Sequence, residues 1–114
     1  MKVAIGCDHA GYPLKVAVED KLLKEGYEII DLGTDSTEPV DYPGYGKAVG
    51  EAVARGLAER GIVICGSGIG ISIAANKVKG VRCALCTSVE MAEMSRRHND
   101  ANVLAMGARM IEQD

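Results

Sequence analysis

Short β-branched runs alternate with amphipathic stretches along the chain, and turn residues separate almost all of them. Such runs are typical of strands, whereas apolar residues that recur every three or four positions are typical of helices. One run, residues 61–65, is apolar throughout, as expected for a strand buried on both faces of a parallel sheet. The alternation predicts βαβ units, in which helices cross over a parallel sheet.

Turn and capping residues place the boundaries of these elements. We expect strands over residues 2–7, 27–32, 61–65, 81–86 and 101–105. We expect helices over residues 13–24, 45–57, 71–78 and about 88–97, the last one beginning at a capping box with the spacing of Thr87 and Glu90. Five strands with four intervening helices predict a Rossmann-like three-layer α/β/α fold with a five-stranded parallel sheet. We expect residues 1–114 to form a single domain.

Composition narrows the possible partners. The 114 residues carry 13 Lys and Arg against 16 Asp and Glu, and the aromatic content is only 4%, all of it Tyr. We therefore expect no nucleic-acid partner. No apolar stretch approaches the roughly 20 residues that span a bilayer, and Asp8 and His9 come too early for a signal peptide. These features predict a cytoplasmic protein that makes no membrane contact and whose four cysteines stay reduced.

Ligands of open α/β sheets bind at the carboxyl ends of the strands, and this rule selects the candidate site. The first expected strand leads to Asp8 and His9, and the third ends at Cys65. The second leads to a loop over residues 33–44, which carries Tyr42 and is long enough to suggest a functional role. We expect these groups to converge.

The last expected helix ends in Arg96-Arg97-His98-Asn99-Asp100. Because this helix returns to the opposite edge of the sheet, His98 and Asn99 should face away from the crevice of their own subunit. In a symmetric dimer they could complete the pocket of the neighbour. The alternative interpretation of each histidine, His9 included, is a solvated surface residue.

The third strand runs directly into Gly66-Ser67-Gly68-Ile69-Gly70. Such a loop before a helix can present several backbone N–H groups to a phosphate or an oxyanion. Its glycine spacing matches neither the dinucleotide-binding motif nor the P-loop, so a tight strand-to-helix turn stays open as an alternative. A Cys65 thiolate beside these amides could act as a base or nucleophile, or the side chain could simply pack as a small hydrophobe.

Three further groups have simpler interpretations. Asp8 could accept a hydroxyl proton or cap the first helix, and both roles are compatible. Arg109 could be an ordinary surface charge. Cys83 and Cys86 form a C-x-x-C spacing, but no second pair completes a zinc site, so we expect no metal and no cofactor.

Four motifs carry a specific resemblance to a known family. The chain resembles ribose-5-phosphate isomerases of the B type, in the family that also contains galactose-6-phosphate and allose-6-phosphate isomerases. The matching motifs are residues 6–11 (GCDHAG), 40–43 (VDYP), 65–77 (CGSGIGISIAANK) and 95–102 (SRRHNDAN).

The resemblance implies a metal-independent aldose–ketose isomerisation through a cis-enediolate, a reaction of the pentose phosphate pathway. By analogy Cys65 is the base, and the amides of Gly66, Gly68, Ile69 and Gly70 hold the enediolate oxygen. Some members of the family use a Glu after the glycine loop as the base, but Ile71 stands there in this sequence.

The remaining roles also follow from the resemblance. His98 matches the ring-opening histidine, and Asn99 assists from the adjoining subunit of a homodimer or tetramer. The sugar hydroxyls are handled by Asp8, Tyr42 and Ser67. His9 and Arg109 match contacts to the substrate phosphate.

One departure concerns length. Relatives continue through another helix and a basic segment with two further phosphate-binding arginines, which have no counterpart up to Asp114. We expect this sequence to be a portion of a longer protein; the alternative is a genuinely short variant of the family.

Competing hypotheses stay open at this point. The substrate could be allose 6-phosphate or galactose 6-phosphate. The domain could be a non-catalytic module that binds a phosphate-containing ligand, with Cys65 merely packed. It could also be a thiol redox protein built on Cys83 and Cys86.

Overall fold

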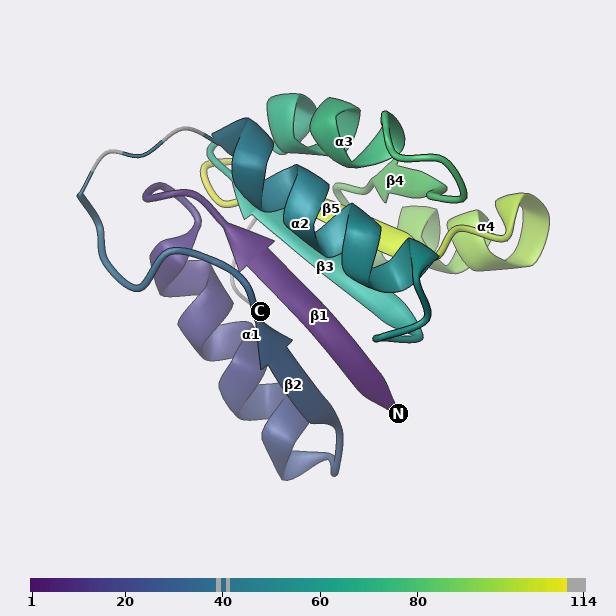
Figure 1. Ribbon diagram of the computed structural model, residues 1–114, viewed down its shortest axis with the longest axis horizontal. Coiled ribbons are helices and arrows are strands. Elements are labelled where there is room, and N and C mark those ends of the chain that lie inside the picture. The colour runs from purple at the N-terminus through teal and green to yellow at the C-terminus, as the bar shows by residue number, and fades with distance from the viewer. Residues whose placement is uncertain (39, 41, 111–114) are drawn as a thin grey trace.

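The computed structural model describes residues 1–38, 40 and 42–110. A single parallel sheet of five strands, in the order β2-β1-β3-β5-β4, forms the centre of the molecule (Figure 1). The strands are β1 (Lys2–Cys7), β2 (Glu28–Asp31), β3 (Arg60–Cys65), β4 (Cys83–Leu85) and β5 (Val103–Gly107). The helices are α1 (Tyr12–Lys24), α2 (Tyr42–Ala54), α3 (Ile69–Asn76) and α4 (Val89–Asn99). The predicted α/β fold with a five-stranded parallel sheet is confirmed.

The strand order determines which face each helix covers. The chain moves from β1 outward to β2, returns past β1 to β3, and later moves from β4 inward to β5. Because crossovers between parallel strands are right-handed, these reversals place α1 and α4 on one face and α2 and α3 on the other. The two layers of helices are visible on either side of the sheet in Figure 1.

The main core lies between the sheet and the α2–α3 layer. Alternate residues of the central strands point to this side, where they meet the apolar faces of both helices. The buried residues of this core include Ala4, Val63, Cys65, Val103 and Ala105 from the sheet, and Val49, Ala52, Ile71 and Ala75 from the helices. Gly61 is required here because a Cβ would lie 2.6 Å from Val49.

On the opposite face, a groove of about 440 Å³ lies over the sheet between α1 and α4. Its floor includes Ile62 and Leu104, and Leu22 of α1 and Ala92 of α4 contribute to its walls. Within the described residues, no helix combines the length and apolarity that a membrane span requires.

Several predicted boundaries are wrong by two or three residues. α2 begins at Tyr42, inside the expected 33–44 loop, because a Pro in the first turn of a helix costs no hydrogen bond. Leu57 lies beyond the end of α2 and is 60% exposed. α3 starts at Ile69 and includes Gly70 in its first turn.

The C-terminal elements differ from the prediction for a related reason. Ala101 still bonds to α4, since its N–H donates to the Ser95 carbonyl, and so β5 starts only at Val103. β4 is limited to Cys83–Leu85. Ser88, not Thr87, is the N-cap of α4, and its side chain accepts the N–H of Met91.

Candidate active site

The glycine loop connects the end of β3 to the first turn of α3. Gly68 adopts a left-handed conformation with φ of 80°, and a Cβ there would lie 2.5 Å from Leu85. The N–H of Ile69 donates to the Ser67 hydroxyl. Gly70 and Ile71 lie in the first turn of α3, where an α-helix provides no internal acceptor for N–H groups. The loop thus carries donors suited to an anion.

Cys65 is the last residue of β3 and is 5% exposed. Its Sγ accepts a hydrogen bond from the backbone N–H of Gly68 at 3.2 Å. The sulfur belongs to the core on the α2–α3 side, yet it directly adjoins the glycine loop. The bond places a donor on the atom that would carry the negative charge of a thiolate.

Asp8 follows β1 directly and lies beside the end of β3, because its N–H donates to the Ile64 carbonyl. The register pairs Cys7 with Ile64, so its continuation aligns Asp8 with Cys65. The Asp8 carboxylate is buried and accepts the N–H of Gly11. Gly11 is the N-cap of α1, so Asp8 holds the turn before the helix rather than capping it.

His9 is the next residue and is half-buried. Its Nδ1 atom accepts a hydrogen bond from the backbone N–H of Val40 at 3.1 Å. Val40 belongs to the connection from β2 to α2, which passes the carboxyl ends of β1 and β3 in Figure 1. Two segments distant in sequence therefore meet at His9.

Arg109 reaches the site from the end of β5. The backbone N–H of Arg109 donates to the Gly66 carbonyl at 2.9 Å, and the N–H of Ala108 donates to the Cys65 carbonyl at 2.8 Å. The guanidinium lies against Gly66, where a Cβ would be 3.0 Å from Nη1. An exposed cation is thus placed over the loop, where it could pair with an anion.

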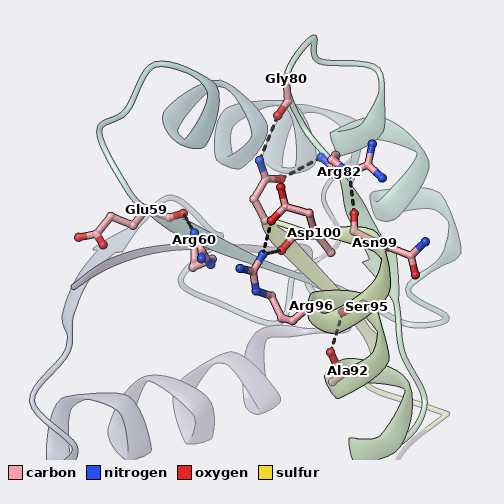
Figure 2. A network of polar contacts seen from close by, with 11 residues as sticks. Glu59, Arg60, Gly80, Arg82, Ala92, Ser95, Arg96, Asn99 and Asp100 are labelled. Carbon is pink, nitrogen blue, oxygen red and sulfur yellow. Dashed lines mark hydrogen bonds and ion pairs between the residues drawn. The ribbon is translucent and has the colours of Figure 1, made fainter.

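His98 and Asn99 lie at the opposite edge of the sheet, as predicted. They form the last turn of α4, and Asp100 ends this helix in a left-handed conformation with φ of 49°. Figure 2 shows how polar contacts fasten the helix end near the starts of the strands: Arg82 donates to the Asn99 carbonyl, and Arg96 pairs with Asp100. The side chains of His98 and Asn99 are exposed, and they lie apart from the Cys65 region of the same chain.

One predicted site residue, Tyr42, is only partly covered by the structure. Tyr42 is the first residue of α2, and its side chain lies outside the described part of the structure. Asp41, its neighbour in the matching motif, lies outside the described residues as well.

The remaining cysteines are Cys7, Cys83 and Cys86. Burial, with a smaller effect of Cys86, raises the pKa of Cys83 to about 12. Burial also raises the pKa of Cys86, and raises that of Cys7 to about 11. All three are free thiols. Protonated thiols at neutral pH are poor redox groups, which argues against the redox hypothesis.

Sequence reasoning missed Lys15. This residue lies inside α1, where it is 2% exposed, and its Nζ pairs with the Asp31 carboxylate at 2.8 Å. Burial opposes the charge of Lys15, but the bonds to Asp31 outweigh it and raise the lysine pKa. Lys15 was hard to find because a lysine next to Leu14 is ordinarily assigned to the solvent face of a helix.

Known proteins match this chain over nearly its whole length. A family model described as Ribose/Galactose Isomerase matches residues 3–114. Ribose-5-phosphate isomerase B of Escherichia coli is 51% identical over 110 residues, which cover 96% of this chain and 74% of that protein. A galactose-6-phosphate isomerase subunit of Clostridium acetobutylicum is 43% identical over 110 residues, covering 96% and 64% respectively.

Solved structures give the same result. Ribose-5-phosphate isomerase B of Clostridium thermocellum matches with a TM-score of 0.99 and 60% identity, covering all of this chain and 77% of that one. The type B enzyme of Trypanosoma brucei matches with a TM-score of 0.93 and 49% identity over 98% and 76%. Together with the fold, these matches define the class of protein as an aldose–ketose isomerase. More particularly, the chain belongs to the Ribose/Galactose Isomerase family.

Proposed function

We propose that this chain interconverts ribose 5-phosphate and ribulose 5-phosphate without a metal ion. One observation carries the proposal: the Cys65 sulfur lies at the carboxyl end of β3, bonded to an N–H of a glycine loop that opens α3. This places a proton acceptor directly beside donors for an oxyanion. An aldose–ketose isomerisation needs both groups at adjacent carbons of the sugar.

The reaction would proceed through a cis-enediolate. The Cys65 thiolate removes the proton from C2 of the open-chain aldose, and the carbonyl oxygen at C1 takes up the negative charge. Amides of the glycine loop stabilise this oxygen. The same proton returns to C1, and a hydroxyl proton moves from O2 to O1, so that ketose and thiolate result. No electron acceptor is required.

The remaining roles come from family analogy. We assign the sugar hydroxyls to Asp8, Ser67 and Tyr42. Contacts to the phosphate are assigned to His9 and Arg109, and the position of the Arg109 guanidinium over Gly66 supports this. Opening of the furanose ring is assigned to His98, assisted by Asn99.

The location of His98 supports a site that is shared with a second subunit. Because His98 and Asn99 lie at the amino edge of the sheet, they cannot join the Cys65 region of their own chain without unfolding α4. We propose a homodimer, or a tetramer built from such dimers, in which each site takes these residues from the neighbour. We also propose that the protein works in the cytoplasm, whose reducing conditions suit four free thiols.

A coupled assay of ribulose 5-phosphate formation in the presence of EDTA tests the proposal. Wild-type protein should turn over, and Cys65→Ala should lower kcat by roughly 10²- to 10⁴-fold, as expected for loss of a general base. The matched control is Cys83→Ala, which removes another thiol of the sheet and should retain activity. Binding of ribose 5-phosphate to Cys65→Ala should persist.

The same assay separates the alternatives. Turnover of only allose 6-phosphate or galactose 6-phosphate would replace the proposed substrate while keeping the mechanism. If the protein binds sugar phosphates but turns over none of the three, the proposed reaction is wrong and the binding module is favoured. An equal loss of activity in Cys65→Ala and Cys83→Ala would contradict the role of Cys65.

A further inference from the structure

An ion pair between a buried lysine and a partly exposed aspartate lies beside the candidate site and has no part in the chemistry proposed above. Lys15 of α1 donates through Nζ to both carboxylate oxygens of Asp31, at 3.0 and 2.8 Å, and to the Thr34 carbonyl at 2.8 Å. The Lys15 side chain is 3% exposed, and that of Asp31 is 43% exposed. Lysines are almost never fully buried unless they are paired, so this arrangement calls for an explanation.

The pair fixes the start of the connection between β2 and α2. The backbone continues the sheet pairing beyond β2, because Leu32 donates to the Ile5 carbonyl at 2.8 Å and Thr34 donates to the Cys7 carbonyl at 3.2 Å. Thr34 is buried, and the ammonium group satisfies its carbonyl oxygen. Lys15 thus holds this segment against the end of β1, next to Asp8 and His9.

The same connection meets the site again at Val40, whose N–H donates to Nδ1 of His9. A ring nitrogen that accepts a hydrogen bond carries no proton. A neutral imidazole has a single N–H, so this bond assigns the proton to Nε2. The orientation and tautomer of His9 therefore depend on where Val40 is held.

We propose that the anchored segment, residues 32–38 and 40, positions His9 for the substrate phosphate, with Lys15 as the positioning residue that holds its start. The Val40 N–H keeps His9 as the Nε2–H tautomer, which offers the phosphate a hydrogen-bond donor. This inference rests on the phosphate role proposed for His9 above. Lys15 itself does not touch the substrate.

A pair of variants separates positioning from simple stabilisation. Lys15→Met keeps the aliphatic chain but leaves the Asp31 charge and the Thr34 carbonyl without their partner. The double variant Lys15→Met with Asp31→Asn also removes that charge, and the amide oxygen can still accept the N–H of Gly33. Neutral replacement of both members of an ion pair leaves no charge without its partner. The double variant should therefore fold and still lack the bond to Thr34.

Nuclear magnetic resonance at pH 8.5 measures the positioning of Val40 and His9 directly and does not depend on enzymatic activity. In the wild type, the Val40 amide should be protected from hydrogen exchange, and His9 should be a single Nε2–H tautomer. In the double variant, protection of Val40 should fall by roughly 3- to 10-fold, the change that loss of one hydrogen bond produces. The His9 nitrogen shifts should move toward a mixture of both tautomers.

Kinetics provide the second readout. The double variant should raise KM for ribose 5-phosphate and the inhibition constant of inorganic phosphate by roughly 3- to 10-fold, with kcat changed less than about 2-fold. Val40→Pro removes the donor to His9 and should show the same pattern. Comparison with Val40→Ala, which keeps the N–H, isolates the effect of the hydrogen bond.

The outcomes are distinct. If the double variant keeps both the Val40 protection and the His9 tautomer of the wild type, Lys15 serves stability alone and the inference is overturned. If these signals change as expected but KM and phosphate inhibition do not, the positioning has no role in phosphate binding and the inference is overturned too. If the wild type turns over no ribose 5-phosphate, the proposed function fails, while exchange and tautomer still decide whether Lys15 positions His9.

Discussion

The backbone nitrogen of Gly68 lies 3.2 Å from the Sγ atom of Cys65 and donates a hydrogen bond to it. The contact depends on the left-handed conformation of Gly68, which turns the chain from β3 into α3. A Cβ at this position would lie 2.5 Å from Leu85 and 2.8 Å from the Met106 backbone. One glycine thus shapes the loop and seats the catalytic thiol of the proposed mechanism.

Gly68→Ala should destabilise the protein by about 2–5 kcal/mol, because the cost of a left-handed alanine adds to the cost of overpacking. Urea unfolding measures this effect. Gly26→Ala is the matched control, since Gly26 has a similar φ of 90° but open space around it, and it should cost only about 1–2 kcal/mol. Equal unfolding midpoints for both variants would contradict the steric role of Gly68.

Arg109→Ala should weaken substrate binding because the guanidinium lies over Gly66, in position to meet the phosphate. Loss of a charge-assisted hydrogen bond should raise KM for ribose 5-phosphate by roughly 10- to 100-fold. Arg55→Ala, at the residue that follows α2, provides the control for loss of a positive charge, because this side chain is 71% exposed. A KM increase of the same size in both variants would show a general electrostatic effect instead.

Mixing of inactive variants tests the shared site. Cys65→Ala and His98→Asn should each be inactive alone. If each site combines Cys65 of one subunit with His98 of the other, subunit exchange in an equal mixture should restore roughly a quarter of wild-type activity, since half of the dimers then hold one intact site. A mixture that exchanges subunits but stays inactive would place both residues in the same chain's site.

Glu19 should make stability depend on pH. Burial, followed by the neighbouring Asp31 carboxylate, raises the pKa of Glu19 from 4.5 to about 7. The folded state then binds a proton more tightly than the unfolded state, so the stabilisation is complete below about pH 4.5 and is lost as the pH rises through 7. Between pH 5 and 8, the Tm of the wild type should therefore fall relative to that of Glu19→Gln.

Asp20→Asn is the control for this experiment, because the Asp20 side chain is 65% exposed and lies next to Glu19 in sequence. Thermal unfolding of the three proteins at pH 5 and pH 8 gives the comparison. Parallel pH profiles for the wild type and Glu19→Gln would show that Glu19 titrates at an ordinary pKa in the folded protein.

Much of the fold could be predicted because the strands and helices of parallel α/β proteins have distinct local patterns of apolar residues. The apolar run 61–65 and the glycine loop located the central strand and the candidate site, and the observed β3 ends at Cys65 as predicted. Boundaries failed at the ends of helices, where the observed helix differs from the expected pattern by a few residues. Ala101 continues the hydrogen bonding of α4, and Tyr42 and Pro43 join α2 although their sequence resembles a loop.

Part of the candidate site could be predicted from the sequence as well. Asp8 and His9 follow β1, and Cys65 ends β3. The carboxyl ends of these parallel strands meet at one edge of the sheet, and the family resemblance supplied the proposed roles of the three residues. Lys15 was not predictable, since its burial depends on Asp31 and Thr34, which the fold brings from 16 and 19 positions away. The bond of His9 to Val40 spans 31 positions and is equally invisible in the sequence.

The sequence by itself determined the alternation of strands and helices, the edge of the sheet that carries the candidate site, and the family. These properties follow from local periodicity and from short motifs, which need no knowledge of long-range contacts. Only the tertiary structure decided that Arg109 lies over Gly66 and that the N–H of Val40 donates to His9. Such contacts depend on strand order and crossover direction, which join residues that no local pattern connects.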